Sequence, residues 1–254
     1  MAAFRILLLG GTTESAALAA LLAGDARFAA TLSLAGRTRT PRPQPLPVRV
    51  GGFGGAEALA RYLHAERIDA LVDATHPFAA VMSHNAAAAA EMAGVALLAL
   101  RRPAWQPQAA DRWICVPDMP AAAAALGAAP RRVLLTVGRQ DLAPFVVAPQ
   151  HYYVVRSVDP PAPDSLPPGA ETLLARGPFE LEEERGLLRH HRIDVIVSKN
   201  SGGSATQAKL AAARELDLEI VMVERPVKPA APTVGNVEAA FEWLAARHAR
   251  SSST

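Results

Sequence analysis

The sequence has little cysteine. Cys115 is the single cysteine among 254 residues, so the chain cannot form an intrachain disulfide, and it has no CxxC pair for zinc binding or redox exchange. Half of the residues are hydrophobic, which is enough to bury a core without such cross-links. The composition therefore favours a reducing compartment, and we expect the protein in the cytoplasm.

Long hydrophobic runs and a strong charge of one sign are also missing. The longest weakly polar stretch, from Ala86 to Leu100, is interrupted by Glu91 and Gly94 and is shorter than a bilayer span requires. The formal net charge is only +2, without the concentrated positive field that nucleic-acid binding usually needs. We therefore expect no membrane segment and no nucleic-acid partner.

Several catalytic motifs are absent. The sequence contains no HExxH motif, EF-hand loop or P-loop, so no metal site is expected. Short-chain dehydrogenases place a lysine four residues after a tyrosine, but no tyrosine of this chain is followed by lysine at that spacing. These absences disfavour the metal-dependent hydrolases and the short-chain dehydrogenases.

What the sequence does contain is an alternation of short apolar runs with alanine-rich segments of helical period. This alternation predicts an α/β fold with parallel sheets. In the first half we expect strands at 5–9, 30–34, 70–73 and 96–100, and helices at 13–22, 56–65 and 77–92. Proline-rich stretches at 40–47 and 159–168, and a third stretch at 102–118, are expected to be irregular.

The chain also carries a weak internal duplication. The run Ile68–Asp73 matches Ile193–Ser198, and each run is followed by a helix, a strand and an Arg-Pro step, first Arg102-Pro103 and then Arg225-Pro226. We therefore predict two similar Rossmann-like halves, residues 1–105 and 106–254. Because ligands bind at the carboxyl ends of parallel strands, the halves are expected to share a cleft.

The first strand runs into a turn of glycines and hydroxyls, where dinucleotide-binding folds hold a pyrophosphate. Glycine allows close approach of the backbone, and a helix N-terminus supplies N–H donors. The candidate cofactor-binding residues are Gly10, Gly11, Thr12, Thr13 and Glu14. The alternative is an ordinary glycine turn in which Thr12 or Thr13 caps the helix.

The end of the second strand indicates which cofactor is used. Arg37 and Thr38 stand where dinucleotide folds meet the adenosine ribose. An acidic residue there favours NAD, whereas arginine accepts a 2′-phosphate. NADPH is therefore the expected cofactor, although a surface arginine in a basic loop is the alternative.

Polar clusters follow one later strand in each half. Thr75 and His76 end the strand at 70–73, and Lys199, Asn200, Ser201, Gly202 and Gly203 end its counterpart. Lysine, paired glycines and hydroxyls at a helix start make a nest of donors for an anion. A capped helix with Ser204 as N-cap explains the serine and glycines but not the lysine.

In these residues the sequence resembles the precorrin-6A reductase family, in its cobalt-independent and cobalt-dependent forms. The resemblance spans nearly the whole chain. It rests on Leu9-Gly-Gly-Thr-Thr-Glu14, Asp73-Ala-Thr-His-Pro-Phe78, Arg176-Gly-Pro-Phe179, the acidic run Glu182–Glu184, Ser198-Lys-Asn-Ser-Gly-Gly203, Thr206 and Lys209.

The resemblance implies a reductase that adds hydride from NADPH, and a proton, to a double bond of precorrin-6A, giving precorrin-6B in cobalamin biosynthesis. It implies Thr75, Ser201, Gly202 and Gly203 as further cofactor-binding residues, and Lys199 and His76 as catalytic candidates. The proton comes from His76, Lys199 or water. Substrate carboxylates are expected to meet Arg101, Arg139, Asn200 and Arg225.

Two other functions remain open for the sequence. One is a different NADPH-dependent reductase or epimerase acting on a smaller substrate, and the other is a dinucleotide-binding regulatory module. The polar nest at 199–203 argues against a pure sensor. The oligomeric state is not indicated by the sequence, and a monomer is the simplest expectation.

Overall fold

The computed structural model describes residues 3–36 and 42–251. The chain forms two compact units. Unit 1 consists of Met1–Pro103 together with Pro226–Thr254, and unit 2 consists of Ala104–Arg225. The chain therefore leaves unit 1 once and returns to it once.

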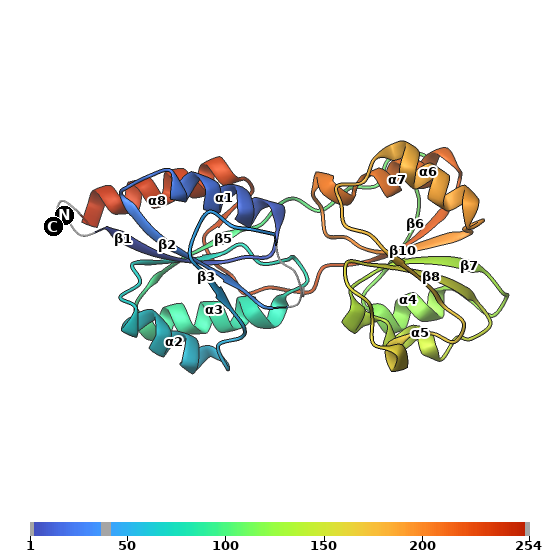
Figure 1. The fold of residues 1–254 in the computed structure, drawn as a ribbon, viewed down its shortest axis with the longest axis horizontal. Helices are drawn as coiled ribbons and strands as arrows, with labels where there is room; N and C mark the ends of the chain where they lie inside the picture. Colours follow the sequence, from blue (N-terminus) through green and yellow to red (C-terminus); the bar gives the residue numbers. More distant parts are fainter. Residues whose placement is uncertain (1–2, 37–41, 252–254) are drawn as a thin grey trace. The chain divides into compact units, whose positions relative to one another are not determined.

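Unit 1 is a six-stranded parallel sheet with helices on both faces. Its strands lie in the order β12-β5-β4-β1-β2-β3. Helices α1 and α8 pack together on one face, and α2 and α3 pack together on the other (Figure 1). The elements are β1 (Phe4–Leu9), α1 (Thr13–Ala23), β2 (Phe28–Leu34), β3 (Val48–Val50), α2 (Ala56–Ala65), β4 (Ala70–Asp73), α3 (Ala80–Ala93), β5 (Ala96–Leu100), β12 (Thr233–Val234) and α8 (Val237–Ser251).

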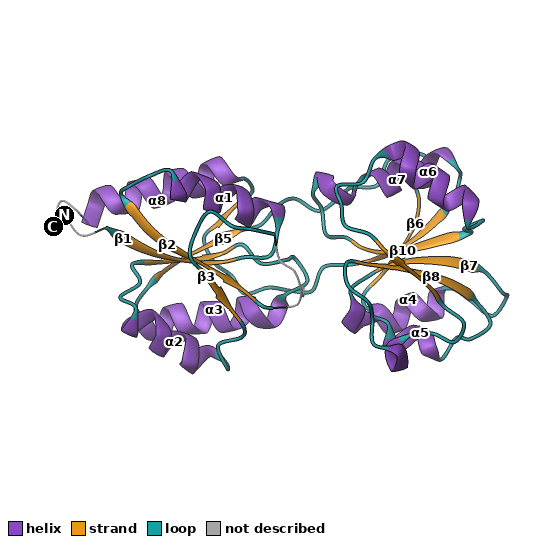
Figure 2. Ribbon diagram, viewed as in Figure 1, coloured by secondary structure: helices purple, strands orange, loops and turns teal. Residues whose placement is uncertain are grey.

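Unit 2 repeats this arrangement with the strand order β6-β11-β10-β7-β8-β9, again all parallel. Figure 2 shows helices on both faces of its sheet. The strands are β6 (Arg112–Val116), β7 (Arg132–Thr136), β8 (Tyr152–Ser157), β9 (Glu171–Leu174), β10 (Val195–Lys199) and β11 (Glu219–Val223). The α-helices are α4 (Met119–Ala125), α5 (Ala143–Val146), α6 (Leu181–His190) and α7 (Ala208–Glu215), and the 3-10 helices are η1 (Arg139–Asp141), η2 (Pro163–Ser165) and η3 (Ser204–Thr206).

The two sheets confirm the predicted fold class of two similar α/β halves with parallel strands. Strands β1 to β5 occupy the same places in the first sheet as β7 to β11 in the second. The sixth strand differs in origin, because β6 precedes the other strands of its sheet and β12 follows them. Each sixth strand therefore follows the crossing of the chain from the other unit.

The boundaries of the units differ from the predicted halves, residues 1–105 and 106–254, because the end of the chain returns to unit 1. Residues 226–254 belong to unit 1. The physical reason is that β12 adds to the edge of β5, with Thr233 opposite Ala99 and Val234 opposite Leu100, while α8 packs against α1.

Two local expectations were also wrong, and the short strand β3 (Val48–Val50) was not predicted. The stretch 102–118 was expected to be irregular but contains β6. Helix α3 begins at Ala80 rather than Pro77, because residues 77–78 form a turn in which the N–H of Ala79 donates to the carbonyl of His76 at 2.8 Å. The helix at 56–65 and the strands at 70–73 and 96–100 have the predicted bounds.

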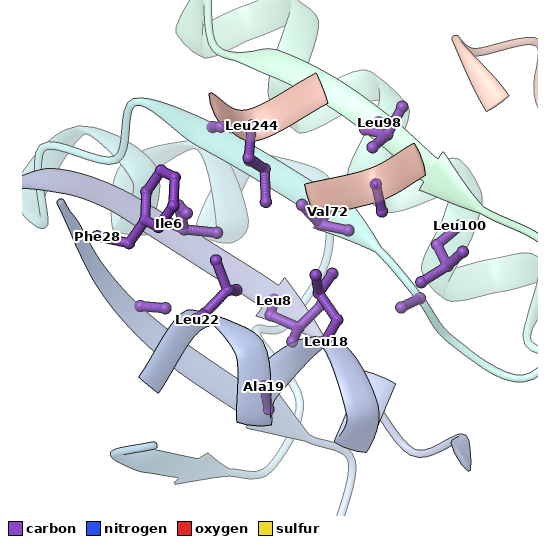
Figure 3. Packing of buried hydrophobic residues seen from close by; sticks show 14 of the residues in the cluster. Ile6, Leu8, Leu18, Ala19, Leu22, Phe28, Val72, Leu98, Leu100 and Leu244 are labelled. Carbon is purple, nitrogen blue, oxygen red and sulfur yellow. The ribbon is translucent and has the colours of Figure 1, made fainter. Parts of the chain in front are cut away.

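Helix α8 completes the core on its face of unit 1. Leu244 is fully buried against side chains of the sheet and of α1, among them Ile6, Leu22 and Phe28 (Figure 3). No helix in residues 3–36 and 42–251 is long and apolar enough to cross a membrane.

We predict that Leu244→Ala destabilises unit 1 selectively, by about 2 to 5 kcal/mol, because it leaves a cavity in that core. Amide hydrogen exchange should become faster in β1 and β4 and stay unchanged in β7 and β10. Leu188→Ala is the matched control, because Leu188 is equally buried in the core of unit 2 and should give the reverse pattern. Faster exchange in β7 and β10 of the Leu244 variant would contradict the assignment of α8 to unit 1.

Candidate functional site

The turn after β1 requires glycine at two positions. A Cβ on Gly10 would lie 2.5 Å from Cδ1 of Leu32 and 3.1 Å from Oγ of Ser15, so Gly10 allows the turn to approach β2. Gly11 has a φ of +118°, which side chains rarely adopt, and no atom lies within 4 Å of its ideal Cβ position. The turn therefore presents open backbone at the carboxyl edge of the sheet.

Hydroxyl groups fix the start of helix α1. Thr12 is the N-cap: its Oγ1 accepts a hydrogen bond from the N–H of Ser15 at 3.1 Å and donates to the carbonyl of Ala74 at 3.0 Å. Oγ of Ser15 accepts from the N–H groups of Gly11 and Thr12, both at 3.0 Å. The alternative role of Thr12 as a helix cap is thus present in the structure, and Ser15 was not singled out by the sequence.

This capping leaves two backbone donors at the helix start. In the part of the chain that the structure describes, no hydrogen bond engages the N–H of Thr13 or Glu14. These groups carry the positive end of the dipole of an 11-residue helix. They can bind an oxyanion such as a phosphate.

The acidic residue beside this turn, Glu14, forms an ion pair. Oε2 of Glu14 lies 2.8 Å from Nη1 of Arg102, and the two side chains are 20% and 14% exposed. Pairing of this carboxylate removes most of the repulsion that it would exert on an anion at the helix start. The binding role of Glu14 stays a prediction.

The end of β4 is held by a buried carboxylate. Asp73, 3% exposed, accepts hydrogen bonds from Oγ1 of Thr75 at 2.6 Å, from its N–H at 3.1 Å, and from Oγ of Ser83 at 2.5 Å. Nδ1 of His76 accepts from the N–H of Phe78 at 3.3 Å. Thr75 and His76 are thereby fixed at the strand edge.

A cation that the sequence analysis missed joins them. Nζ of Lys228 donates to the carbonyl of His76 at 3.2 Å and lies 3.4 Å from Oγ1 of Thr75. Lys228 comes from the segment that returns from unit 2, more than 150 residues away in sequence. Local sequence patterns carry no signal for such a contact.

Two candidates for the adenosine end, Arg37 and Thr38, lie outside the described residues. The neighbouring strand β3 contributes Arg49, whose guanidinium donates to the carbonyls of Gly51 at 2.5 Å and Gly52 at 2.8 Å. It also lies 3.7 Å from the ring centroid of Phe53. Arg49 therefore stabilises the glycine-rich loop ahead of α2.

In unit 2, the corresponding edge carries an ion pair. Nζ of Lys199, at the end of β10, lies 2.5 Å from Oδ2 of Asp141, and the side chains are 17% and 28% exposed. A Cβ on Gly138 would lie 2.7 Å from the same oxygen, so glycine there makes room for the carboxylate. Asp141 therefore orients Lys199. In the sequence, Asp141 is marked only by its position three residues after Gly138.

The rest of the turn after β10 is fastened by Trp105. The side chain of Asn200 accepts from the N–H of Trp105 at 2.9 Å and donates to its carbonyl at 3.1 Å. The indole N–H donates to the carbonyl of Gly203 at 3.1 Å, and Nε of Arg225 donates to the carbonyl of Asn200 at 2.8 Å. Asn200 and Arg225, predicted to bind substrate, thus have structural tasks here.

The other predicted residues have the following surroundings. Arg101 donates from Nη2 to the carbonyl of Pro229 at 2.9 Å, and Nη2 of Arg139 lies 3.7 Å from a carboxylate oxygen of Asp159. Ser201 is buried, and Gly202 and Gly203 have φ values of +66° and +83°. The binding roles of all these residues stay predictions.

A buried cation lies beneath the same turn. Lys209 is 4% exposed, and its Nζ donates to the carbonyl of Thr206 at 3.2 Å and lies 5.0 Å from the ring centroid of Trp105. Next to it, the buried Arg156 and Glu184 form an ion pair. Burial, and then the charge of Arg156, lower the pKa of Lys209 to about 7.

Within residues 3–36 and 42–251, no group of three or more His, Cys, Asp and Glu side chains is placed to hold a metal ion. The two parallel sheets, each with helices on both faces (Figure 2), define an α/β protein of the doubly wound class.

Residues 5–245 match the family model described as Precorrin-6x reductase CbiJ/CobK. The chain therefore belongs to the precorrin-6x reductase family, and it is an oxidoreductase by that membership. The family and the enzyme class predicted from the sequence are both confirmed.

Relatives and a solved structure agree with this assignment. The chain is 56% identical to a precorrin-6A reductase from Sinorhizobium sp. over 95% of this chain and 94% of that one. It is 29% identical to a cobalt-precorrin-6A reductase from Priestia megaterium, over 87% and 90%. A solved structure described as CobK precorrin-6A reductase is similar with 49% identity and a TM-score of 0.91 over 96% of both chains.

We predict that Lys209 makes the stability of unit 2 depend on pH above neutrality. Its pKa is about 7 in the folded state and near 10.4 in an unfolded chain, so between these values the unfolded state binds one more proton. The wild type should therefore gain about 1.4 kcal/mol per pH unit relative to Lys209→Met from pH 7 to 9. Below pH 7 both states are protonated, and the difference should stay constant.

Urea unfolding at pH 6, 7, 8 and 9, followed by tryptophan fluorescence, measures this difference. Arg189→Met is the control, because Arg189 is an exposed cation on α6, and the stability of this variant should change with pH as that of the wild type does. A difference between wild type and Lys209→Met that is the same at pH 7 and pH 9 would contradict the prediction.

Proposed function

We propose that this chain reduces a double bond of the precorrin-6A macrocycle with NADPH, in cobalamin biosynthesis, to give the dihydro product precorrin-6B. The observation that carries the proposal is the match to the precorrin-6x reductase family over residues 5–245. Relatives named precorrin-6A reductase support it, at 56% identity for one from Sinorhizobium sp. and 50% for one from Rhodobacter capsulatus, each over 95% of this chain. The cytoplasm is the compartment that suits a chain with one cysteine.

The residues at the turn of unit 1 fit a dinucleotide. Gly11 has open space on the side where a side chain would stand, and the N–H groups of Thr13 and Glu14 can donate to a pyrophosphate. Arg102 neutralises the carboxylate of Glu14. Bound NADPH supplies the hydride, so the protein has to supply orientation, electrostatics and a proton.

The residues of unit 2 suit the carboxylates of a tetrapyrrole. Lys199 stands at the end of β10, oriented by Asp141, and Arg139 follows the neighbouring strand β7. An ammonium ion pairs readily with carboxylates, and arginine binds them with two parallel hydrogen bonds. Lys199 and Arg139 are therefore the side chains that we assign to the macrocycle.

The proposal is tested by anaerobic mixing of the protein with NADPH and metal-free precorrin-6A, with cobalt-loaded substrate in parallel. NADPH oxidation should accompany a change in the visible absorbance of the macrocycle. Arg37→Ala should lower the affinity for NADPH by about tenfold to a hundredfold and the affinity for NADH far less, because only NADPH has the 2′-phosphate. Failure of the wild type to oxidise NADPH with either substrate excludes the proposed reaction. Equal losses of affinity for NADPH and NADH in the Arg37 variant exclude a contact of Arg37 with the 2′-phosphate.

We predict that Lys199→Ala lowers turnover of the macrocycle and leaves NADPH affinity largely intact. Lys199→Arg separates two roles, because arginine keeps the charge but does not readily lose a proton. Activity restored by arginine indicates carboxylate binding, and activity lost in both variants indicates proton donation. Steady-state kinetics and direct titration with NADPH measure these effects, and full activity of the alanine variant would remove Lys199 from the reaction.

A further inference from the structure

The segment that returns to unit 1 is held in a defined place. The carbonyl of Pro232 accepts from the N–H of Ala99 at 2.8 Å, and the carbonyl of Val234 accepts from the N–H of Arg101 at 2.9 Å. The side chain of Arg101 also donates to the carbonyl of Pro229 at 2.9 Å. These contacts fix residues 229–234 along the end of β5, and they position Lys228 just before them.

The side chain of Lys228 lies over the end of the next strand, β4. It is half-buried, and its Nζ lies 3.2 Å from the carbonyl of His76 and 3.4 Å from Oγ1 of Thr75. The residue before Thr75, Ala74, accepts the hydrogen bond from Thr12 at 3.0 Å. The glycine turn, through Thr12, and the ammonium of Lys228 thus form hydrogen bonds with neighbouring residues at the end of the same strand, β4.

That strand end lies at the point where the order of the sheet reverses. From β1 the chain runs first to β2 on one side, and later to β4 on the other. Dinucleotides bind at the carboxyl edge at such a point, with the pyrophosphate at the turn after the first strand. Lys228 is on the β4 side of this point, opposite the side of the adenosine.

The duplication shows what the equivalent position does in unit 2. Trp105 stands 123 residues before Lys228, the same separation as between the two Arg-Pro steps at 102 and 225. Trp105 lies on the turn after β10 just as Lys228 lies on the turn after β4. Packing the crossing segment onto a strand end is therefore possible with an uncharged side chain, and the cation at 228 is specific to unit 1.

We propose that Lys228 is a cofactor-binding residue whose ammonium pairs with the pyrophosphate of the dinucleotide. This inference rests on the proposed use of NADPH. Lysine binds phosphate as a compact point charge, and Lys228 adds this charge to the backbone donors of Thr13 and Glu14. The cofactor site of unit 1 is accordingly completed by a residue from the segment that returns from unit 2.

The experiment compares Lys228→Met, which keeps the length of the aliphatic stem, with Lys228→Arg, which keeps the charge. Calorimetric titration without substrate uses three ligands: NADPH, 2′-phospho-ADP-ribose, which lacks the nicotinamide, and adenosine 2′-monophosphate, which lacks the pyrophosphate. Lys228→Met should lower the affinity for NADPH and for 2′-phospho-ADP-ribose by about tenfold to a hundredfold, and it should leave the affinity for adenosine 2′-monophosphate unchanged. Lys228→Arg should restore most of the affinity.

Val227→Ala is the matched control, because Val227 is on the same segment and 87% exposed, and it should bind all three ligands as the wild type does. Unchanged NADPH affinity in Lys228→Met overturns the inference, as does an equal loss for adenosine 2′-monophosphate or a loss confined to NADPH. Unchanged cofactor affinity with a raised KM for the macrocycle would place Lys228 against the substrate and also overturn it. Failure of the wild type to bind NADPH would instead defeat the proposed function itself.

Discussion

The pairing of β12 with β5 is the contact on which the arrangement of unit 1 depends. It involves only two residue pairs, yet it brings α8 onto the open face of the sheet, where Leu244 and Ala240 are fully buried. It also covers the edge of β5, which would otherwise expose unpaired backbone groups. Because β12 and α8 follow unit 2 in the chain, unit 1 cannot be cut out as one contiguous piece. The same pairing holds residues 226–232, which lead from unit 2 back to β12, against unit 1. Lys228 reaches the end of β4 because it lies in this returning segment.

The polar turns of both units are fixed by side-chain hydrogen bonds, some local and some from residues distant in sequence, in addition to their own backbone geometry. In unit 1, Thr12 joins the turn after β1 to the end of β4 through the carbonyl of Ala74, and Asp73 anchors Thr75. In unit 2, Trp105 holds Asn200 and Gly203. Such contacts limit the motion of the groups to which we assign cofactor and substrate binding, and a preorganised site does not have to be ordered at the moment of binding.

Much of the fold could be predicted because its signals are local. Strand β4 and helix α2 have the expected bounds, since apolar runs and glycines mark them, and the order of repeated motifs indicated two halves. Strand β3 was missed because it has three residues, two of them exposed, and β6 because it lies in a stretch read as irregular. The exchange of the sixth strands was missed because no local pattern states which sheet edge a strand joins. In the site, the contacts of Asp141 and Lys228 join residues that are distant in sequence, so no local pattern indicates them. The glycines, Thr12, Thr75, His76 and Lys199 could be singled out because they directly follow predicted strands.

The equivalent turns of the two units differ in ways that underlie the different ligands that we propose for them. After β1, the chain enters an 11-residue helix whose first N–H groups face an open turn beside Gly11. After β7, it enters a 3-10 turn and a four-residue helix, and the carboxylate of Asp141 occupies the space beside Gly138. A short helix has little dipole to offer, and the side chain of Asp141 fills the space that is open beside Gly11 in unit 1. The cation paired with Asp141, Lys199, then has a fixed position from which to meet a different anion. Divergence at a few turn positions, with the strand order unchanged, is therefore the basis on which we propose a pyrophosphate at the turn of unit 1 and substrate carboxylates at the turn of unit 2.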